Sequence, residues 1–168
     1  TEGLCGPFRP GHFQGVATIV TKLLLQCLPD AGFFGEKDYQ QLLVIRQMVR
    51  QFVLPVQIHA MPTIRDPDGL AKSSRNNYLN AEQRREAIAL YAALEQLAKA
   101  VQDGGSDLAQ LSHQAMQGLS AQGWQPDYLT VRRQEDLREA TGADRQLVAL
   151  GAARLGGTRL IDNLRFSR

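Results

Sequence analysis

The first 61 residues alternate between helical and extended apolar spacing, and this alternation restricts the chain to few folds. Apolar side chains recur at helical spacing over residues 16–28, where Pro29 ends the pattern. The short apolar segment 31–34, a second helical stretch over 42–52 and an extended segment at 56–61 follow. The second helix has its apolar face at Leu42, Ile45, Val49 and Phe52. This order predicts a parallel α/β sheet of which two strands form only a part.

The second half of the chain begins with two predicted helical stretches. After a turn-rich segment at 65–77, Asn80 and Gln83 form a plausible capping pair for one long helix that continues to Val101. A further helix is predicted over residues 107–122, with Ser106 as its cap.

Extended segments dominate the remainder. A strand is predicted at 128–132, a short helix at 134–140, and two more strands at 146–155 and 158–163. Gly156-Gly157 between the last two strands is a strong hairpin signal. Helices followed by a hairpin indicate an α+β unit, so two domains are predicted, residues 1–63 and 64–168.

Composition excludes several classes of protein. The 168 residues are 43% hydrophobic and 21% charged, which supports a packed core, and the net charge of +2 does not indicate nucleic acid or membrane as a partner. Cys5 and Cys27 fit no metal or disulfide spacing, and a signal peptide and a membrane-length apolar run are both lacking. A cytoplasmic protein is expected. The chain opens at Thr1 in a loop-like segment, which predicts that it is the C-terminal part of a longer protein.

Gly35-Glu36-Lys37-Asp38 stands between a predicted strand and a predicted helix. Ligands of open α/β sheets lie beyond the carboxyl ends of strands, and a lysine beside a helix start suits phosphate. The alternative is a loop whose charges are simply solvated, and the tetrapeptide alone does not decide between the two.

Residues 68–76 form a second candidate, because they place two serine hydroxyls and a guanidinium in one turn-rich loop. Such a loop offers donors to several phosphate oxygens and could close over a triphosphate. Composition alone slightly favours a polar interdomain linker.

Two further segments are weaker candidates. His12 in Arg9-Pro10-Gly11-His12-Phe13 could contact a ligand or hold its own loop, and Arg9 stands where an HxGH motif needs its first histidine. Gln41 could bind a hydroxy acid, although a polar residue in a first helical turn needs no such role. His59 and His113 are interpreted as structural, and the arginines after residue 132 lack the aromatic neighbours that nucleic acids require.

Four motifs in this order resemble the pantothenate synthetase (pantoate–β-alanine ligase) family. They are RPGHF followed by GV and KL, then FGEKDYQQL, RDPDGLAKSSRNNYL and RLIDN, and they span residues 1–163. The resemblance implies the tail of a Rossmann-like nucleotidyltransferase domain of the HxGH superfamily, followed by a small α+β domain with a short antiparallel sheet. It also implies an ATP-dependent ligase that forms pantoyl adenylate with release of pyrophosphate, then pantothenate and AMP.

The resemblance assigns roles to individual positions. Catalytic roles fall on Lys37, Ser73, Ser74 and Arg75. ATP binding falls on Phe34, Gly35, Glu36, Lys37, Asp38, Ile64 and the KMSKS-like loop Lys72, Ser73, Ser74 and Arg75. Pantoate binding falls on Arg9, His12, Val16, Ile19, Val20 and Gln41. Lys72 departs from the family, which has an apolar residue there, and its ammonium could add a phosphate contact.

The family's HxGH motif, a second substrate glutamine and the acidic Mg²⁺ site are expected on an N-terminal segment outside this chain, so no metal ligand is assigned within it. The chain alone is therefore expected to be inactive and to expose normally covered apolar surface. Implied ligands are ATP, Mg²⁺, pantoate and β-alanine, with a homodimeric full-length protein and neither nucleic acid nor membrane as partner. The sequence also resembles cyanobacterial bifunctional proteins in which a cytidylate kinase follows the ligase. A non-catalytic nucleotide-binding module is the alternative.

Overall fold

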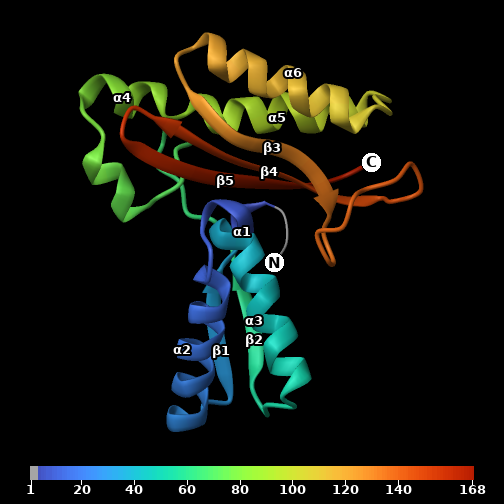
Figure 1. The fold of residues 1–168 in the computed structure, drawn as a ribbon. Coiled ribbons are helices and arrows are strands. Elements are labelled where there is room, and N and C mark those ends of the chain that lie inside the picture. Colours follow the sequence, from blue (N-terminus) through green and yellow to red (C-terminus); the bar gives the residue numbers. More distant parts are fainter. Residues whose placement is uncertain (1–3) are drawn as a thin grey trace. The chain divides into compact units, whose positions relative to one another are not determined.

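The computed structural model describes residues 4–168, which divide into two compact units between Thr63 and Ile64. Figure 1 labels the helices and strands of both units.

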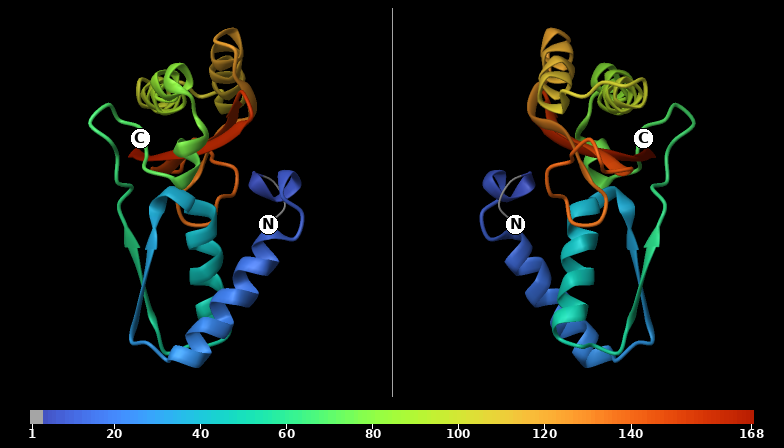
Figure 2. Two further views of the ribbon diagram at one scale, coloured as in Figure 1. Left: turned by 90° about the vertical axis from the view of Figure 1, so that its left-hand side faces the viewer. Right: turned by 90° about the vertical axis from the view of Figure 1, so that its right-hand side faces the viewer.

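The first unit is a parallel strand pair with helices on one side (Figure 2). Its elements are α1 (Cys5–Phe8), α2 (His12–Cys27), β1 (Ala31–Gly35), η1 (Glu36–Asp38), α3 (Tyr39–Gln51) and β2 (Gln57–Met61). The two strands pair in parallel from Ala31 opposite Gln57 to Gly35 opposite Met61. The predicted parallel α/β arrangement is therefore confirmed.

The core of this unit lies between the helices and the strands. Leu24 of α2 packs with Ile45 and Val49 of α3, and Phe34 and Ile58 from the strands lie against them. Burial of these side chains supplies most of the driving force that holds the helices on the strand pair.

Much apolar surface of the first unit is exposed in this chain. Ile19 on α2 is 69% exposed, Leu28 directly after α2 is 73% exposed, and Phe33 on β1 is 67% exposed. Phe52 was predicted on the buried face of α3, and this was wrong. The helix ends at Gln51, so Phe52 leaves the helical periodicity and is 61% exposed.

The second unit is a three-stranded antiparallel sheet covered by two helices on one face (Figure 1). Its elements are η2 (Ser74–Tyr78), α4 (Ala81–Glu86), α5 (Ala89–Gln102), α6 (Leu108–Ala121), β3 (Gln125–Arg133), β4 (Gln146–Leu155) and β5 (Thr158–Ser167). The strand order is β3-β4-β5. The predicted hairpin is confirmed, with Leu155 opposite Thr158 and Gly156 at a φ of 56° that favours glycine.

Leucines and valines from both layers form the core of the second unit. Leu94 and Val101 of α5, Leu119 of α6, and Leu129 and Leu147 of the sheet are almost fully buried. This core fixes β5 and α5, the two elements whose side chains anchor the hairpin at residues 64–72.

Three local predictions for this unit were wrong. The long helix is interrupted between Glu86 and Ala89, so α4 and α5 are separate, although the Asn80–Gln83 capping box is present. Helix α6 is capped by Asp107, whose side chain accepts from the Gln110 amide, and not by Ser106.

The third error concerns residues 134–140, which form a turn instead of a short helix. The Gln134 side chain donates to the carbonyls of Leu147 and Phe166, and Leu137 has a φ of 58°. These contacts bind the segment to the sheet, and the Leu137 amide closes the turn by donating to the Arg133 carbonyl at 3.1 Å.

Within residues 4–168 no helix has the length and apolar character needed to cross a membrane.

Candidate functional site

The Gly35–Asp38 turn lies where the sequence analysis expected it, at the carboxyl end of β1. Gly35 is extended and exposed, Glu36–Asp38 form one 3₁₀ turn, and α3 follows without a break. Tyr39, which is only 6% exposed, anchors the start of α3 in the unit. The Lys37 side chain is half-buried at this junction, beside the strand end and the helix start. Lys37 thus lies at the kind of position, a strand end beside a helix start, where the sequence analysis expected a lysine suited to phosphate.

The first turn of α3 also holds the N-terminal segment of the unit. The Gln40 side-chain oxygen accepts a hydrogen bond from the Cys5 amide at 3.2 Å. Gln41, the next residue, is half-buried. This contact ties the segment that leads to Arg9 and His12 to the helix that carries Gln41.

The proposed pantoate residues on α2 do not share one environment. Val16 and Val20 pack against the core of the unit, whereas Ile19 is exposed. His12 begins the helix, and its ring lies 5.1 Å from the ring of Phe13. The structure therefore places Ile19 on a different side of α2 from Val16 and Val20.

In the second unit, residues 64–72 form a tight hairpin that leads into the serine–serine–arginine segment. The amide of Lys72 donates to the carbonyl of Ile64 at 2.9 Å, and Arg65 and Ala71 form an antiparallel bridge. The turn closes through the Gly69 amide and the Asp66 carbonyl, with Gly69 at a φ of 94°. Asp-Pro-Asp-Gly is a sequence suited to such a turn.

A buried ion pair anchors one side of this hairpin. The Arg65 guanidinium donates two hydrogen bonds to the Asp162 carboxylate on β5, at 2.7 and 2.9 Å, and one to the Gly69 carbonyl. It also lies 3.6 Å from the ring centre of Tyr91 on α5. Burial opposes the charge, but Asp162 outweighs it and raises the pKa of Arg65 above its ordinary value.

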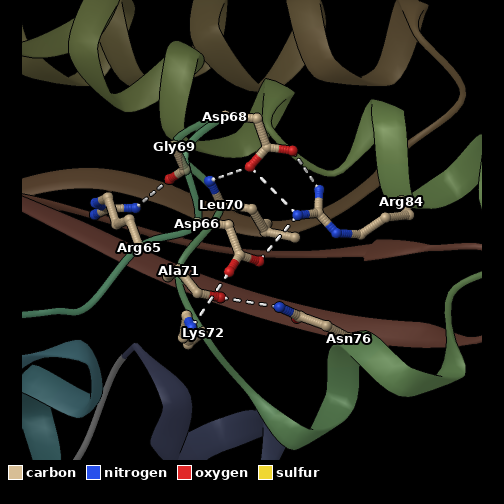
Figure 3. A network of polar contacts seen from close by, with 9 residues as sticks. All are labelled: Arg65, Asp66, Asp68, Gly69, Leu70, Ala71, Lys72, Asn76 and Arg84. Carbon is tan, nitrogen blue, oxygen red and sulfur yellow. Dashed lines mark hydrogen bonds and ion pairs between the residues drawn. The ribbon is translucent and has the colours of Figure 1, made fainter.

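A second guanidinium holds the tip of the hairpin (Figure 3). Arg84 of α4 donates to Asp68 at 2.6 Å and to Asp66 at 2.9 Å. Asp66 also lies 3.7 Å from the ammonium of Lys72, whose side chain is 63% exposed. The ammonium of Lys72 is therefore paired with a carboxylate of its own hairpin.

The segment Lys72–Arg75 follows directly and is shaped by its own backbone. The Ser73 hydroxyl accepts a hydrogen bond from the Arg75 amide at 3.2 Å. Ser74 is exposed and Arg75 is half-buried. The Asn76 side chain donates to the carbonyl of Ala71 at 3.0 Å, across the four intervening residues (Figure 3). The hydroxyl and guanidinium groups of residues 72–75, the segment predicted to bind phosphate and called the phosphate loop for that reason, are thus presented from a closed turn.

Sequence reasoning missed the residues that hold these segments in place. Arg84, Asp162, Tyr91, Asn76 and Gln40 were given no role. The Asp-Pro-Asp-Gly turn could have indicated the hairpin. The partner of Arg65 lies 97 positions away, where local patterns give no signal.

The clamp of Arg84 on the two aspartates leads to a pH-dependent prediction. The hydrogen bond from Arg84, with a second from the Leu70 amide, lowers the pKa of Asp68 below its ordinary value. A lowered pKa means that the stabilisation is complete above the ordinary aspartate pKa of about 3.9 and is lost as the pH falls through the folded-state value. Arg84→Gln should therefore lower the urea midpoint at neutral pH, and by less in acid.

Arg85→Gln is the matched control, because Arg85 is the exposed neighbour on the same helix. It removes the same charge but not the clamp, so its effect should be small at both pH values. Equal midpoint shifts for the two variants, or a shift for Arg84→Gln that does not change with pH, would show that the ion pairs do not stabilise the hairpin.

The fold places the chain among α/β proteins in which a parallel unit is followed by an α+β unit with an antiparallel sheet. The family profile described as Pantoate-beta-alanine ligase matches residues 1–165. The chain belongs to this family, whose relatives are named pantothenate synthetases.

Sequence relatives and solved structures support this assignment. A pantothenate synthetase of Pseudomonas paraeruginosa is 56% identical over 98% of this chain and 58% of its own length. The pantothenate synthetase structure from Thermus thermophilus is 43% identical, with a TM-score of 0.89 over 98% of this chain and 61% of that one. The chain therefore spans about three fifths of the relatives it matches.

A third relative was solved with ligands. The pantoate–β-alanine ligase of Francisella tularensis, described as complexed with β-γ ATP and β-alanine, is 31% identical with a TM-score of 0.65. The match covers 96% of this chain and 53% of that protein.

Proposed function

We propose that the protein containing this chain condenses pantoate with β-alanine in an ATP-dependent reaction that passes through pantoyl adenylate. The observation that carries this proposal is the family match over residues 1–165, together with the two phosphate-directed segments at 35–38 and 72–75. The ligands described for the Francisella relative, an ATP compound and β-alanine, agree with the two substrate classes that the reaction needs.

In the first step, a carboxylate oxygen of pantoate attacks the α-phosphorus of ATP. The new P–O bond replaces the bond to the β-phosphate oxygen, and pyrophosphate leaves with that electron pair. Negative charge increases on the phosphate oxygens and on the departing group. Lys37, the exposed hydroxyl of Ser74 and the guanidinium of Arg75 are suited to stabilise it.

In the second step, the amine of β-alanine attacks the acyl carbon of pantoyl adenylate. The C–N bond forms, the C–O bond to AMP breaks, and the amine gives up a proton. For this step the protein must hold the pantoyl group and shield the adenylate from water. Gln41, Arg9 and His12, with Val16, Val20 and Ile19 of α2, are the proposed pantoate contacts.

The other proposed ATP contacts lie next to Lys37 in the sequence and at Ile64. Phe34, Gly35, Glu36 and Asp38 surround Lys37 in sequence, and Ile64 is the proposed adenine contact through its backbone. Its carbonyl accepts one hydrogen bond from the Lys72 amide at 2.9 Å and keeps a second lone pair, so both the carbonyl and the amide of Ile64 are candidate contacts. Lys72 and Ser73 would contribute mainly by shaping the phosphate loop.

Mg²⁺ would enter as part of the Mg–ATP substrate. Within residues 4–168 no group of three histidine, cysteine, aspartate or glutamate side chains is placed to hold a metal ion. We further propose that the remaining length of the relatives supplies the HxGH-type motif and the Mg²⁺ ligands, and that the full protein is a cytoplasmic homodimer. A following cytidylate kinase also remains a prediction.

The test uses an extended protein, in which this chain is completed with the part of the Pseudomonas paraeruginosa relative that the match leaves out. Radioactive pyrophosphate should enter ATP when pantoate is present and β-alanine is absent. With pantoate labelled by ¹⁸O in its carboxylate, one labelled oxygen should appear in AMP after β-alanine is added.

Two outcomes would contradict the proposal. Label in inorganic phosphate instead of AMP would indicate an acyl phosphate intermediate. ATP binding with neither exchange nor pantothenate formation would support the non-catalytic nucleotide-binding module.

A further inference from the structure

The phosphate loop is closed at its base by one side chain that does not belong to it. Asn76 in η2 donates from its side-chain nitrogen to the carbonyl of Ala71 at 3.0 Å, so residues 72–75 are enclosed between the two bonded positions. The Asn76 amide also donates to the Ser73 carbonyl at 3.1 Å, and Ser73 caps the Arg75 amide. Three hydrogen bonds thus define the shape of a loop with only four residues.

The ends of the loop are themselves fixed to the second unit. Ala71 is 3% exposed and paired with Arg65, whose guanidinium is bound to Asp162 on β5. Helix η2, which carries Asn76, packs against β5 as well. The bond between Ala71 and Asn76 therefore joins two fixed points, and it sets the distance that the loop has to span.

The chemistry of the contact requires an amide donor. A backbone carbonyl can only accept, so an aspartate at this position would place a carboxylate against it and lose the hydrogen bond. The other polar atom of the side chain, Oδ1 of Asn76, is buried and has no hydrogen-bond partner among residues 4–168. The amide nitrogen is thus the atom through which Asn76 acts in this structure.

We propose that Asn76 is a positioning residue for the phosphate loop, holding Ser74 and Arg75 in the arrangement that receives the triphosphate. This inference takes its ligand, ATP, from the proposed function. The loop geometry from which it is argued does not depend on that function. A loop ordered before binding loses less conformational freedom when the ligand arrives, which increases affinity without any contact to the ligand.

The chain provides a matched pair of variants for the test. Asn76→Asp and Asn77→Asp introduce the same charge at adjacent positions. Only the first removes the bond to Ala71, because the Asn76 side chain makes that bond, whereas Asn77 is exposed. In the extended protein, Asn76→Asp should raise the KM for ATP in pantoate-dependent pyrophosphate exchange about tenfold relative to Asn77→Asp. The KM for pantoate should change much less. Asn76→Ala provides an uncharged second variant if the aspartate protein does not fold.

Measuring the KM values at lower pH distinguishes this positioning role from a general loss of stability. A protonated aspartate at position 76 regains an O–H donor that can reach the Ala71 carbonyl. Because partial burial against a carbonyl raises the pKa of such a carboxyl above the ordinary value of about 3.9, the ratio of the KM values of Asn76→Asp and Asn77→Asp should decrease as the pH falls toward about 5. The titration of ATP itself cancels in this ratio.

Hydrogen exchange of the Ser73–Arg75 amides in the 168-residue chain tests the loop geometry without ATP. Asn76→Asp should accelerate this exchange, whereas Asn77→Asp should leave it unchanged. Equal exchange rates, or equal KM values in the two variants, would overturn the inference. If the unsubstituted extended protein shows no pyrophosphate exchange while the loop amides respond as expected, the proposed function fails and the geometric role of Asn76 stands.

Discussion

Replacing Lys37 with alanine in the extended protein is expected to lower kcat/KM for pantothenate formation by about 100- to 1,000-fold. Lys37 is half-buried at the carboxyl end of β1, immediately before α3. A cation fixed at this position stabilises the charge that develops on the phosphates in the transition state, and alanine supplies neither charge nor donor. Pyrophosphate exchange should decrease to a similar extent, because the effect lies in the adenylation step.

Lys22→Ala is the control for this prediction, because Lys22 is an exposed lysine on α2 of the same unit. It should retain the activity of the unsubstituted protein. A Lys37→Ala protein that keeps about half of the original rate would exclude Lys37 from the chemistry, and a matching loss in Lys22→Ala would point to a general charge effect.

Replacing Asp162 with alanine is expected to reduce the free energy of unfolding of the second unit by about 3 kcal/mol. Asp162 is 4% exposed in its side chain and receives two hydrogen bonds from Arg65. Its loss leaves a largely buried guanidinium without its carboxylate, although the ring of Tyr91 still lies against the cation. Urea unfolding followed by circular dichroism would measure the change.

A different ion pair in the same unit calibrates this result. Glu139 is 89% exposed in its side chain and lies 3.4 Å from Arg132, so Glu139→Ala should cost less than about 0.5 kcal/mol. The double substitution Arg65→Ala with Asp162→Ala should be less destabilising than the sum of the single substitutions. Equal effects of Asp162→Ala and Glu139→Ala would show that the buried pair does not anchor the hairpin.

Local sequence signals predicted the elements that place the candidate site. The strand–turn–helix order around Lys37, the Asn80–Gln83 capping box and the Gly156-Gly157 hairpin each depend on residues that are close in sequence. Each of these features is present in the structure. The alternation of helical and extended spacing also predicted a parallel sheet, and β1 and β2 are parallel in the structure.

Tertiary contacts explain what the sequence could not show. The RDPDG and RLIDN motifs were recognised separately, but the ion pair between Arg65 and Asp162 joins them across 97 positions. The same limit applies to Arg84, whose role depends on how α4 faces the hairpin tip. Phe52 was misplaced because a helical period does not reveal where the helix ends.

The short helix predicted at 134–140 failed for a related reason. Its local composition allows a helix, but the Gln134 side chain bonds to two strands of the sheet and holds a turn in place. Such side-chain contacts to a distant backbone compete successfully with weak helical propensity.

The central proposal is that Lys37 contacts the phosphates of ATP, and an acyl-phosphate derivative of ATP tests it most directly. A lysine amine near the phosphates attacks the acyl carbon and releases ATP, and mass spectrometry then identifies the acylated residue. The chain has four lysines, Lys22, Lys37, Lys72 and Lys99. In the extended protein, Lys37 should be acylated, and excess ATP should prevent this. Acylation of Lys37 no faster than that of Lys22 and Lys99, and insensitive to ATP, would contradict the claim.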